Sequence, residues 1–181
     1  MKLFVITSRI PFPLDKGDKL RIYHQLKELS KQHEIYLCAI KSTLSKEHKL
    51  SREVLNEFCE EVYFINQSLL LTLFSLLKSF FNALPFQTAL FTEFRAKKRV
   101  NHIIDKIKPD HIYCQLTRAA EYVKDRKETK TIDYMDVFSK GMERRALKSS
   151  MLTKWLYKWE SSKQKNYEKS IYYIEKYSKM P

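Results

Sequence analysis

The amino-acid sequence predicts an α/β protein with a Rossmann-like, doubly wound, mostly parallel sheet of about five or more strands. Short apolar runs alternate along the chain with segments whose apolar residues recur about every 3.6 positions, a pattern typical of strand–helix–strand units. The runs show no polar alternation, which favours strands buried on both faces of a sheet. Beyond residue 140 the runs stop, and a basic helical tail is expected.

The first strand is expected at residues 2–7, which are apolar and partly β-branched. Two prolines follow it and forbid a helix in the next stretch, so a loop is expected up to residue 18. Either Asp15 or Asp18 is expected to cap a helix that then runs to about Gln32.

The later elements are bounded by similar signals. The second helix is expected to start at Ser45 or Ser51. Pro109 is expected to end a later helix, the one at 93–106. A loop or short turn is expected at 84–92, which contains a proline, and a loop is expected at 115–120. The remaining elements are expected as strands at 34–40, 61–65, 110–114 and 130–136, and as helices at 47–58, 68–84, 93–106, 120–126, 140–149 and 151–177.

Ligands of doubly wound sheets bind at the carboxyl ends of the strands, near the reversal of strand order. The segments 8–18, 115–118 and 136–141 follow the first, fourth and fifth expected strands, so we expect them to border this crevice.

The first of these segments has features that suit a phosphate group. Lys16, Gly17 and Asp18 directly precede a helix, whose amino end carries unpaired N–H groups and a positive partial charge. Gly17 would let a ligand approach the backbone closely, and Arg21 adds positive charge. An ordinary strand-to-helix turn is the alternative.

The other two segments offer different groups. Gln115 and Arg118 would face the same crevice, although a solvated loop is the alternative there. Asp133 and Asp136 are three positions apart and so face opposite sides of a strand, which argues against a paired-carboxylate acid–base device. The five histidines have no metal-ligand spacing, so no metal site is expected.

The formal net charge of +13 predicts attraction to nucleic acid, an anionic membrane surface or phosphorylated substrates. No nucleic-acid-binding motif accompanies the charge, so nucleic acid is not the expected partner. Cys38, Cys59 and Cys114 are isolated, and we expect reduced core residues of a cytoplasmic protein. The first residues are not expected to form a signal peptide, because their apolar run is too short.

For two segments the sequence does not decide whether they contact a membrane. The strongly apolar helix at 68–84 is expected in the core or, alternatively, at a surface that dips into a membrane; it falls short of the roughly 20 residues needed to span one. Trp155 and Trp159 are i, i+4 neighbours that either pack a solvated helix or mark a face for anionic lipid or nucleic acid. Peripheral attachment at the inner membrane face therefore stays open beside a cytoplasmic location.

Five segments together carry a family resemblance. They are Ser8-Arg-Ile-Pro-Phe-Pro-Leu-Asp-Lys-Gly-Asp-Lys-Leu-Arg21, Tyr23-His24, His33-Glu34-Ile35, Leu84-Pro-Phe-Gln87 and Ile132-Asp-Tyr-Met-Asp-Val-Phe-Ser-Lys-Gly141. With them, roughly residues 1–170 resemble the amino-terminal half of a GT-B glycosyltransferase of the group 1 (family 4) kind. The likeness is to bacterial sugar transferases of exopolysaccharide and PEP-CTERM-associated systems.

The resemblance implies a protein of two Rossmann-like domains with the site between them. The amino-terminal domain would bind a glycan or lipid-linked acceptor, and the other domain the nucleotide-sugar, which is a co-substrate; no cofactor and no metal are implied. By that similarity Lys16, Gly17 and Asp18 would line the cleft, with Arg21, Gln115 and Arg118 as further candidates.

The expected organisation is an acceptor-side domain at 1–140 and a basic aromatic helical tail at 141–181, the start of the interdomain region. By the resemblance, the second domain with the family's Glu-x7-Glu donor motif is expected to lie outside this chain, and we interpret the same spacing between Glu160 and Glu168 as chance. The chain is therefore expected to be truncated and inactive alone, by natural truncation, frameshift or deliberate shortening. The alternative is a basic nucleic-acid-binding or membrane-surface module without catalysis.

Overall fold

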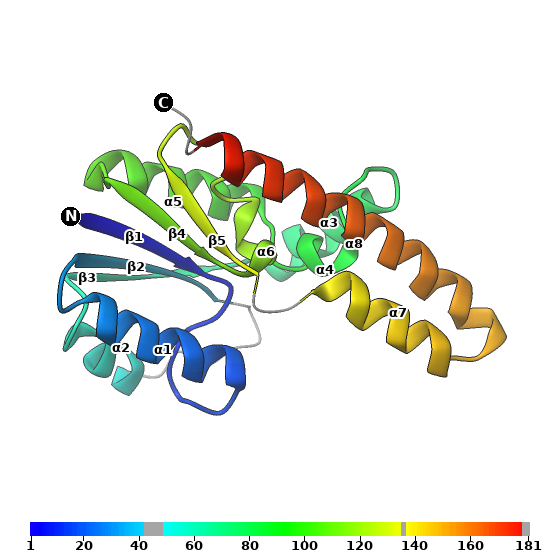
Figure 1. Ribbon diagram of the computed structural model, residues 1–181, viewed down its shortest axis with the longest axis horizontal. Helices are drawn as coiled ribbons and strands as arrows, with labels where there is room; N and C mark the ends of the chain where they lie inside the picture. The colour runs from blue at the N-terminus through cyan, green and yellow to red at the C-terminus, as the bar shows by residue number, and fades with distance from the viewer. Residues whose placement is uncertain (42–48, 135–136, 179–181) are drawn as a thin grey trace.

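The computed structural model describes residues 1–41, 49–134 and 137–178 and confirms the expected α/β class (Figure 1). Five parallel strands form one sheet in the order β3-β2-β1-β4-β5. The strand order reverses between β1 and β4, which are neighbours in the middle of the sheet. The strands are β1 (Lys2–Thr7), β2 (Glu34–Lys41), β3 (Glu61–Asn66), β4 (His111–Gln115) and β5 (Lys130–Asp133).

Helices cover both faces of the sheet, which explains the continuous apolar runs (Figure 1). On one face, Leu3 and Val5 of β1 pack with α1 (Gly17–Leu29) and α2 (Lys49–Asn56). On the other, Phe4 and Ile6 belong to the core built with α5 (Phe94–Ile107), α6 (Leu116–Ala120) and the last helix. Successive side chains of β1 therefore belong in turn to two separate cores, one on each face of the sheet.

The expected helical tail is present as α7 (Phe138–Lys148) and α8 (Met151–Ser178), which pack against each other as a hairpin. Figure 1 shows this hairpin extending beyond the end of the sheet, after which α8 returns over it. Tyr167 and Ile171 of α8 are buried in the core, and the Tyr167 hydroxyl donates a hydrogen bond to the Thr117 carbonyl oxygen. The second half of the tail is therefore part of the packed domain.

The expected cap of the first helix is wrong, and of the two starts expected for the second helix only Ser51 can be compared with the structure. Helix α1 begins at Gly17, with Lys16 at the N-cap position and no side-chain cap. Asp15 precedes the helix and pairs with Lys19, whereas Asp18 lies inside the first turn, where its carboxylate pairs with Arg9 and accepts a hydrogen bond from the Lys19 backbone N–H. At α2, Ser51 lies inside the helix, and Ser45 is outside the described residues.

The expected loop at 115–120 and helix at 120–126 are also wrong. Gln115 is the last residue of β4, and α6 follows it directly because Leu116 adopts a left-handed φ of 65° that turns the chain sharply. Residues 121–125 form turns. In the expected loop at 84–92, the short helix α4 (Phe86–Ala89) begins immediately after Pro85. β5 ends at Asp133, and residues 135 and 136 lie outside the described residues.

The apolar helix expected at 68–84 is α3 (Leu69–Ser79), and the expectation that it belongs to the core is wrong. Ser79 is its only residue classed as buried, whereas Leu70 is 78% exposed and Phe74 is 65% exposed. Among the described residues, no helix has both the length and the apolar character needed to cross a bilayer. The three cysteines are buried free thiols, as expected.

Candidate functional site at the carboxyl edge of the sheet

The loop after β1 is tied to the end of β4. The Gln115 side-chain amide donates a 2.8 Å hydrogen bond to the backbone carbonyl of Asp18, and the Asp18 carboxylate lies 2.8 Å from an Arg9 guanidinium nitrogen. Because β1 and β4 flank the reversal of strand order, these contacts bring two of the three predicted segments together at the edge where such sheets bind ligands.

Within that loop, much of the charge is already paired. Lys19 lies 2.7 Å from Asp15, and Arg9 pairs with Asp18, so each cation faces a carboxylate. The Asp18 carboxylate also accepts a hydrogen bond from the Lys19 backbone N–H in the first turn of α1. Lys16 and Gly17 are exposed, and a Cβ added at Gly17 would meet nothing within 4 Å. The start of α1 is thus open, but a carboxylate in its first turn opposes phosphate binding there.

Arg21 lies in a different cluster, at the end of β5. Its guanidinium lies 3.1 Å from the Asp133 carboxylate, which also accepts a 3.1 Å hydrogen bond from the Tyr113 hydroxyl. Burial and the neighbouring Asp133 carboxylate raise the pKa of Tyr113. This cluster ties α1 to β4 and β5 and does not include Arg118; the second predicted carboxylate, Asp136, is outside the described residues.

Arg118 is held rigidly in α6. Its guanidinium carbon lies 4.1 Å from the ring centroid of Phe138 and 4.8 Å from that of Phe91, so the cation is flanked by two aromatic rings. One of its terminal nitrogens donates a 3.1 Å hydrogen bond to the side-chain oxygen of Gln87 in α4. These contacts fix the orientation of the guanidinium group.

Arg118 also lines a cavity of about 280 Å³ between α4, α6 and α7. α6 and α7 follow β4 and β5 in the chain, so this cavity lies on the carboxyl side of the sheet. Its polar lining consists of one amide and three guanidinium groups, from Gln87, Arg118, Arg144 and Arg145. Among the described residues, neither Arg144 nor Arg145 has a carboxylate within ion-pair distance. The cavity is therefore strongly positive.

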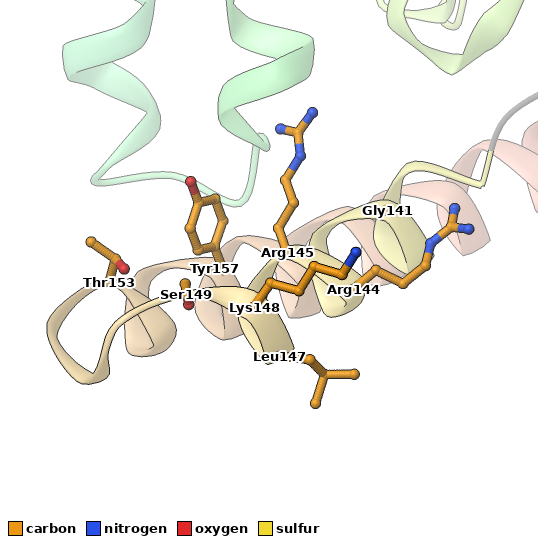
Figure 2. Close-up of a pocket in the computed structure, with 8 residues that line it drawn as sticks. All are labelled: Gly141, Arg144, Arg145, Leu147, Lys148, Ser149, Thr153 and Tyr157. Carbon is orange, nitrogen blue, oxygen red and sulfur yellow. The ribbon is translucent and has the colours of Figure 1, made fainter.

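A second, more open hollow of about 700 Å³ adjoins this cavity and shares Gly141, Arg144 and Arg145 with it. Figure 2 shows Arg144, Arg145 and Lys148 extending from α7 and Tyr157 extending from α8. Planar guanidinium forks bind phosphate oxygens in pairs, and an ammonium adds a point charge. The two hollows together suit a ligand with more than one phosphate charge.

Two buried hydroxyl groups lie where β1 and β4 end. Ser8 is 2% exposed and Thr117 is 1% exposed, and within the described part of the chain neither hydroxyl has a hydrogen-bond partner. Unpartnered buried hydroxyls are costly, and such groups are typical of sites completed by a ligand or ordered water. In the described segments, no three His, Cys, Asp or Glu side chains gather as a metal site would require.

The sequence did not single out Gln87, Arg144 or Arg145 as site residues, whereas Phe138 belongs to the segment 136–141 that was expected to border the crevice. The Arg144-Arg145 pair carried a usable signal, because it falls about two helical turns after the fifth expected strand. The spacing of Glu160 and Glu168 has a structural role: Glu160 accepts a hydrogen bond from the Gln87 backbone N–H, and Glu168 accepts two from Ser139.

Comparison of this chain with models of known protein families, with curated proteins and with solved structures gives no significant match.

Proposed function

We propose that this chain is the acceptor-side half of a GT-B glycosyltransferase, which transfers sugar from a nucleotide-sugar to a glycan or lipid-linked acceptor. A second Rossmann-like domain would supply the donor site. The support is the parallel sheet with its reversal between β1 and β4, together with the resemblance carried by the loop after β1 and the segment after β5.

The observation that carries the proposal is the arginine-lined cavity. Arg118 is oriented by two rings and an amide, and Arg144 and Arg145 complete a positive wall on the carboxyl side of the sheet. A lipid-linked acceptor of the kind implied by the resemblance carries a diphosphate between the sugar and the lipid. Guanidinium groups would hold that diphosphate while the neighbouring loop borders the sugar.

The predicted loop residues have secondary roles in this arrangement. Gln115 fixes the start of α1 against β4, so that Lys16, Gly17 and Asp18 border the same edge. Arg21 fixes α1 to the end of β5 through Asp133. No cofactor is proposed, and the nucleotide-sugar acts as co-substrate on the second domain.

Calorimetric titration with a short-chain isoprenyl diphospho-sugar tests the site, with the same sugar on an uncharged isoprenyl ether as the negative ligand. Arg144→Ala and Arg145→Ala are each expected to weaken binding at least about tenfold, since a hydrogen bond to a charged group is worth about 1.5–3 kcal/mol. Arg99→Ala is the matched control, because Arg99 is an exposed arginine of α5, and it should change affinity less than about twofold.

Equal binding of the charged and uncharged ligands, or equal effects of the cavity and control variants, would overturn the phosphate site.

The proposal that this chain is only the acceptor-side half of the transferase has a separate test. The purified 181-residue chain, incubated with a panel of sugar nucleotides and a lipid-linked acceptor, is expected to show no turnover. Turnover at ordinary enzyme rates would contradict it.

A further inference from the structure

Helix α3 exposes most of its large apolar side chains, whereas a helix on the surface of a globular protein normally turns them toward the core. Its outward residues recur at helical spacing and are all more than half exposed: Leu70 78%, Leu73 54%, Phe74 65%, Leu77 56% and, just beyond the helix, Phe81 93%.

The small polar residues of the same helix face the protein. Ser79 is fully buried, and Thr72 and Ser75 are partly buried. The Ser79 carbonyl oxygen accepts a hydrogen bond from Lys163 of α8, and its hydroxyl donates to the carbonyl of Leu76. The hydrogen bond from Lys163 ties the carboxyl end of α3 to α8, and most of the leucine and phenylalanine side chains of α3 lie outward.

The exposed side of α3 continues onto α8 through stacked rings. Phe80 stacks on Trp159 with 6.1 Å between ring centroids, and Trp159 stacks on Trp155 at 6.3 Å. Phe80 is 55% exposed and Trp155 is 69% exposed, so the row of rings reaches the surface at both ends. Figure 1 shows α3 lying beside α8. We call this surface the α3–α8 apolar face; it consists of Leu70, Leu73, Phe74, Leu77, Phe80, Phe81, Trp155 and Trp159.

Lysines adjoin the α3–α8 apolar face. Lys78, Lys154 and Lys158 are exposed and directly follow or precede Leu77, Trp155 and Trp159 in the sequence, and the Lys163 ammonium lies 4.5 Å from the ring centroid of Trp159. Between residues 138 and 178 the chain has ten Lys and Arg residues against four Glu. Leucine and phenylalanine on one face, tryptophan beside them and lysines at the rim are the composition of helices that lie in the interface of an anionic bilayer.

We infer that the α3–α8 apolar face docks the protein onto a membrane surface that contains anionic phospholipid. α3 lies in the plane of the interface, its leucines and phenylalanines enter the acyl boundary, Trp155 lies at headgroup depth and the lysines contact lipid phosphates. The choice of lipid over a protein partner rests on the lysine rim and its match to anionic headgroups. The inference does not rest on the proposed transferase function, because vesicle binding would stand even if no diphospho-sugar bound.

Vesicle co-sedimentation with the full chain tests the inference, with neutral phosphatidylcholine vesicles and vesicles containing about a third phosphatidylglycerol. The mixed vesicles are expected to bind at least about tenfold more tightly at ~0.1 M salt. Phe74→Glu should weaken this binding at least about tenfold. Leu50→Glu, a matched control at a 57% exposed leucine of α2, should weaken it no more than about threefold.

Tryptophan fluorescence gives an independent readout of depth. Bound protein should show a blue-shifted emission that brominated lipids quench, and Trp155→Phe should remove much of that quenching while Trp159 remains. Circular dichroism melting of Phe74→Glu would show that the exposed substitution leaves the fold intact.

Several outcomes would overturn the inference. One is the absence of binding to mixed vesicles at ~0.1 M salt. A second is equal weakening by Phe74→Glu and Leu50→Glu, which would mean a purely electrostatic attraction of the kind that nucleic acid also exerts. A third is a wild-type dimer that Phe74→Glu makes monomeric without any vesicle binding, which would assign the face to a second copy of the chain.

Discussion

The side-chain amide of Gln115 donates a 2.8 Å hydrogen bond to the backbone carbonyl of Asp18, which joins the end of β4 to the first turn of α1. Gln115 is 3% exposed, so water does not compete freely for this bond. The two residues are 97 positions apart in the sequence, and their bond holds the loop after β1 against the strand across the reversal of strand order.

Gln115→Ala is therefore expected to lower the free energy of unfolding by about 1–3 kcal/mol, because it removes a buried donor and its packing. The measurement is urea unfolding followed by circular dichroism. Gln32→Ala is the control, since Gln32 is exposed after α1, and should change stability by less than about 0.5 kcal/mol. Equal effects at the two positions would mean that the bond between Gln115 and Asp18 does not contribute.

Lys108→Gly is expected to stabilise the protein by about 0.5–1 kcal/mol. Lys108 ends α5 in the left-handed region, with φ 50° and ψ 64°, where a Cβ is unfavourable and glycine is not. Thermal and urea unfolding measure the gain. Lys106→Gly, inside the last turn of the same helix, should instead lose about 1 kcal/mol. A loss of stability in Lys108→Gly would contradict the left-handed conformation at the end of α5.

Much of the fold could be predicted because its signals are local. The buried runs around Val5, Leu37 and Ile112 mark strands covered on both faces, and Pro109 marks the end of α5. The left-handed Leu116 could not be predicted in the same way, because leucine is not a residue that favours positive φ. Its sharp turn starts α6 directly after β4, where the sequence indicated a loop.

The candidate site was less accessible from the sequence because it depends on tertiary packing. Arg118 was a candidate because it follows an expected strand. Its cavity is completed by Arg144 and Arg145, which belong to a helix that the sequence indicated only as part of a basic tail. The sequence also could not give the orientation of α3. Its composition is apolar on most sides, and the side that is exposed depends on how the helix packs against the rest of the protein, where Ser79 is buried and its carbonyl oxygen is bound by Lys163.

The three cysteines are expected to resist thiol reagents in the native state. Burial raises the pKa of Cys59 to about 12 and raises the pKa of Cys38 as well, so little of the reactive thiolate forms at neutral pH. Labelling by a chromogenic disulfide at pH 8 should be at least about 100-fold slower in buffer than in urea, where all three thiols react. Rapid native labelling of one thiol would contradict this burial.

Glu160→Gln is expected to change how stability depends on pH. Glu160 is 4% exposed, and burial raises the pKa of its carboxyl against the opposing effects of the Gln87 backbone N–H and Lys163. In the pH window between the ordinary carboxyl pKa and the raised one, the folded chain binds more protons than the unfolded chain. The contribution of Glu160 to stability is therefore fully present below the unfolded-state pKa, about 4.3, and is lost as pH rises through the folded-state pKa.

The measurement is urea unfolding of wild type and Glu160→Gln between about pH 4 and 8. The stability of wild type minus that of the variant should fall as pH rises across this range. Glu28→Gln is a control of opposite sign, measured from about pH 2 to 5: a hydrogen bond from Lys31 lowers the pKa of exposed Glu28, so the same difference should rise with pH across that window and stay level above it. A difference for Glu160 that stays constant, or that follows the Glu28 direction, would mean that its carboxylate is well solvated in the folded protein.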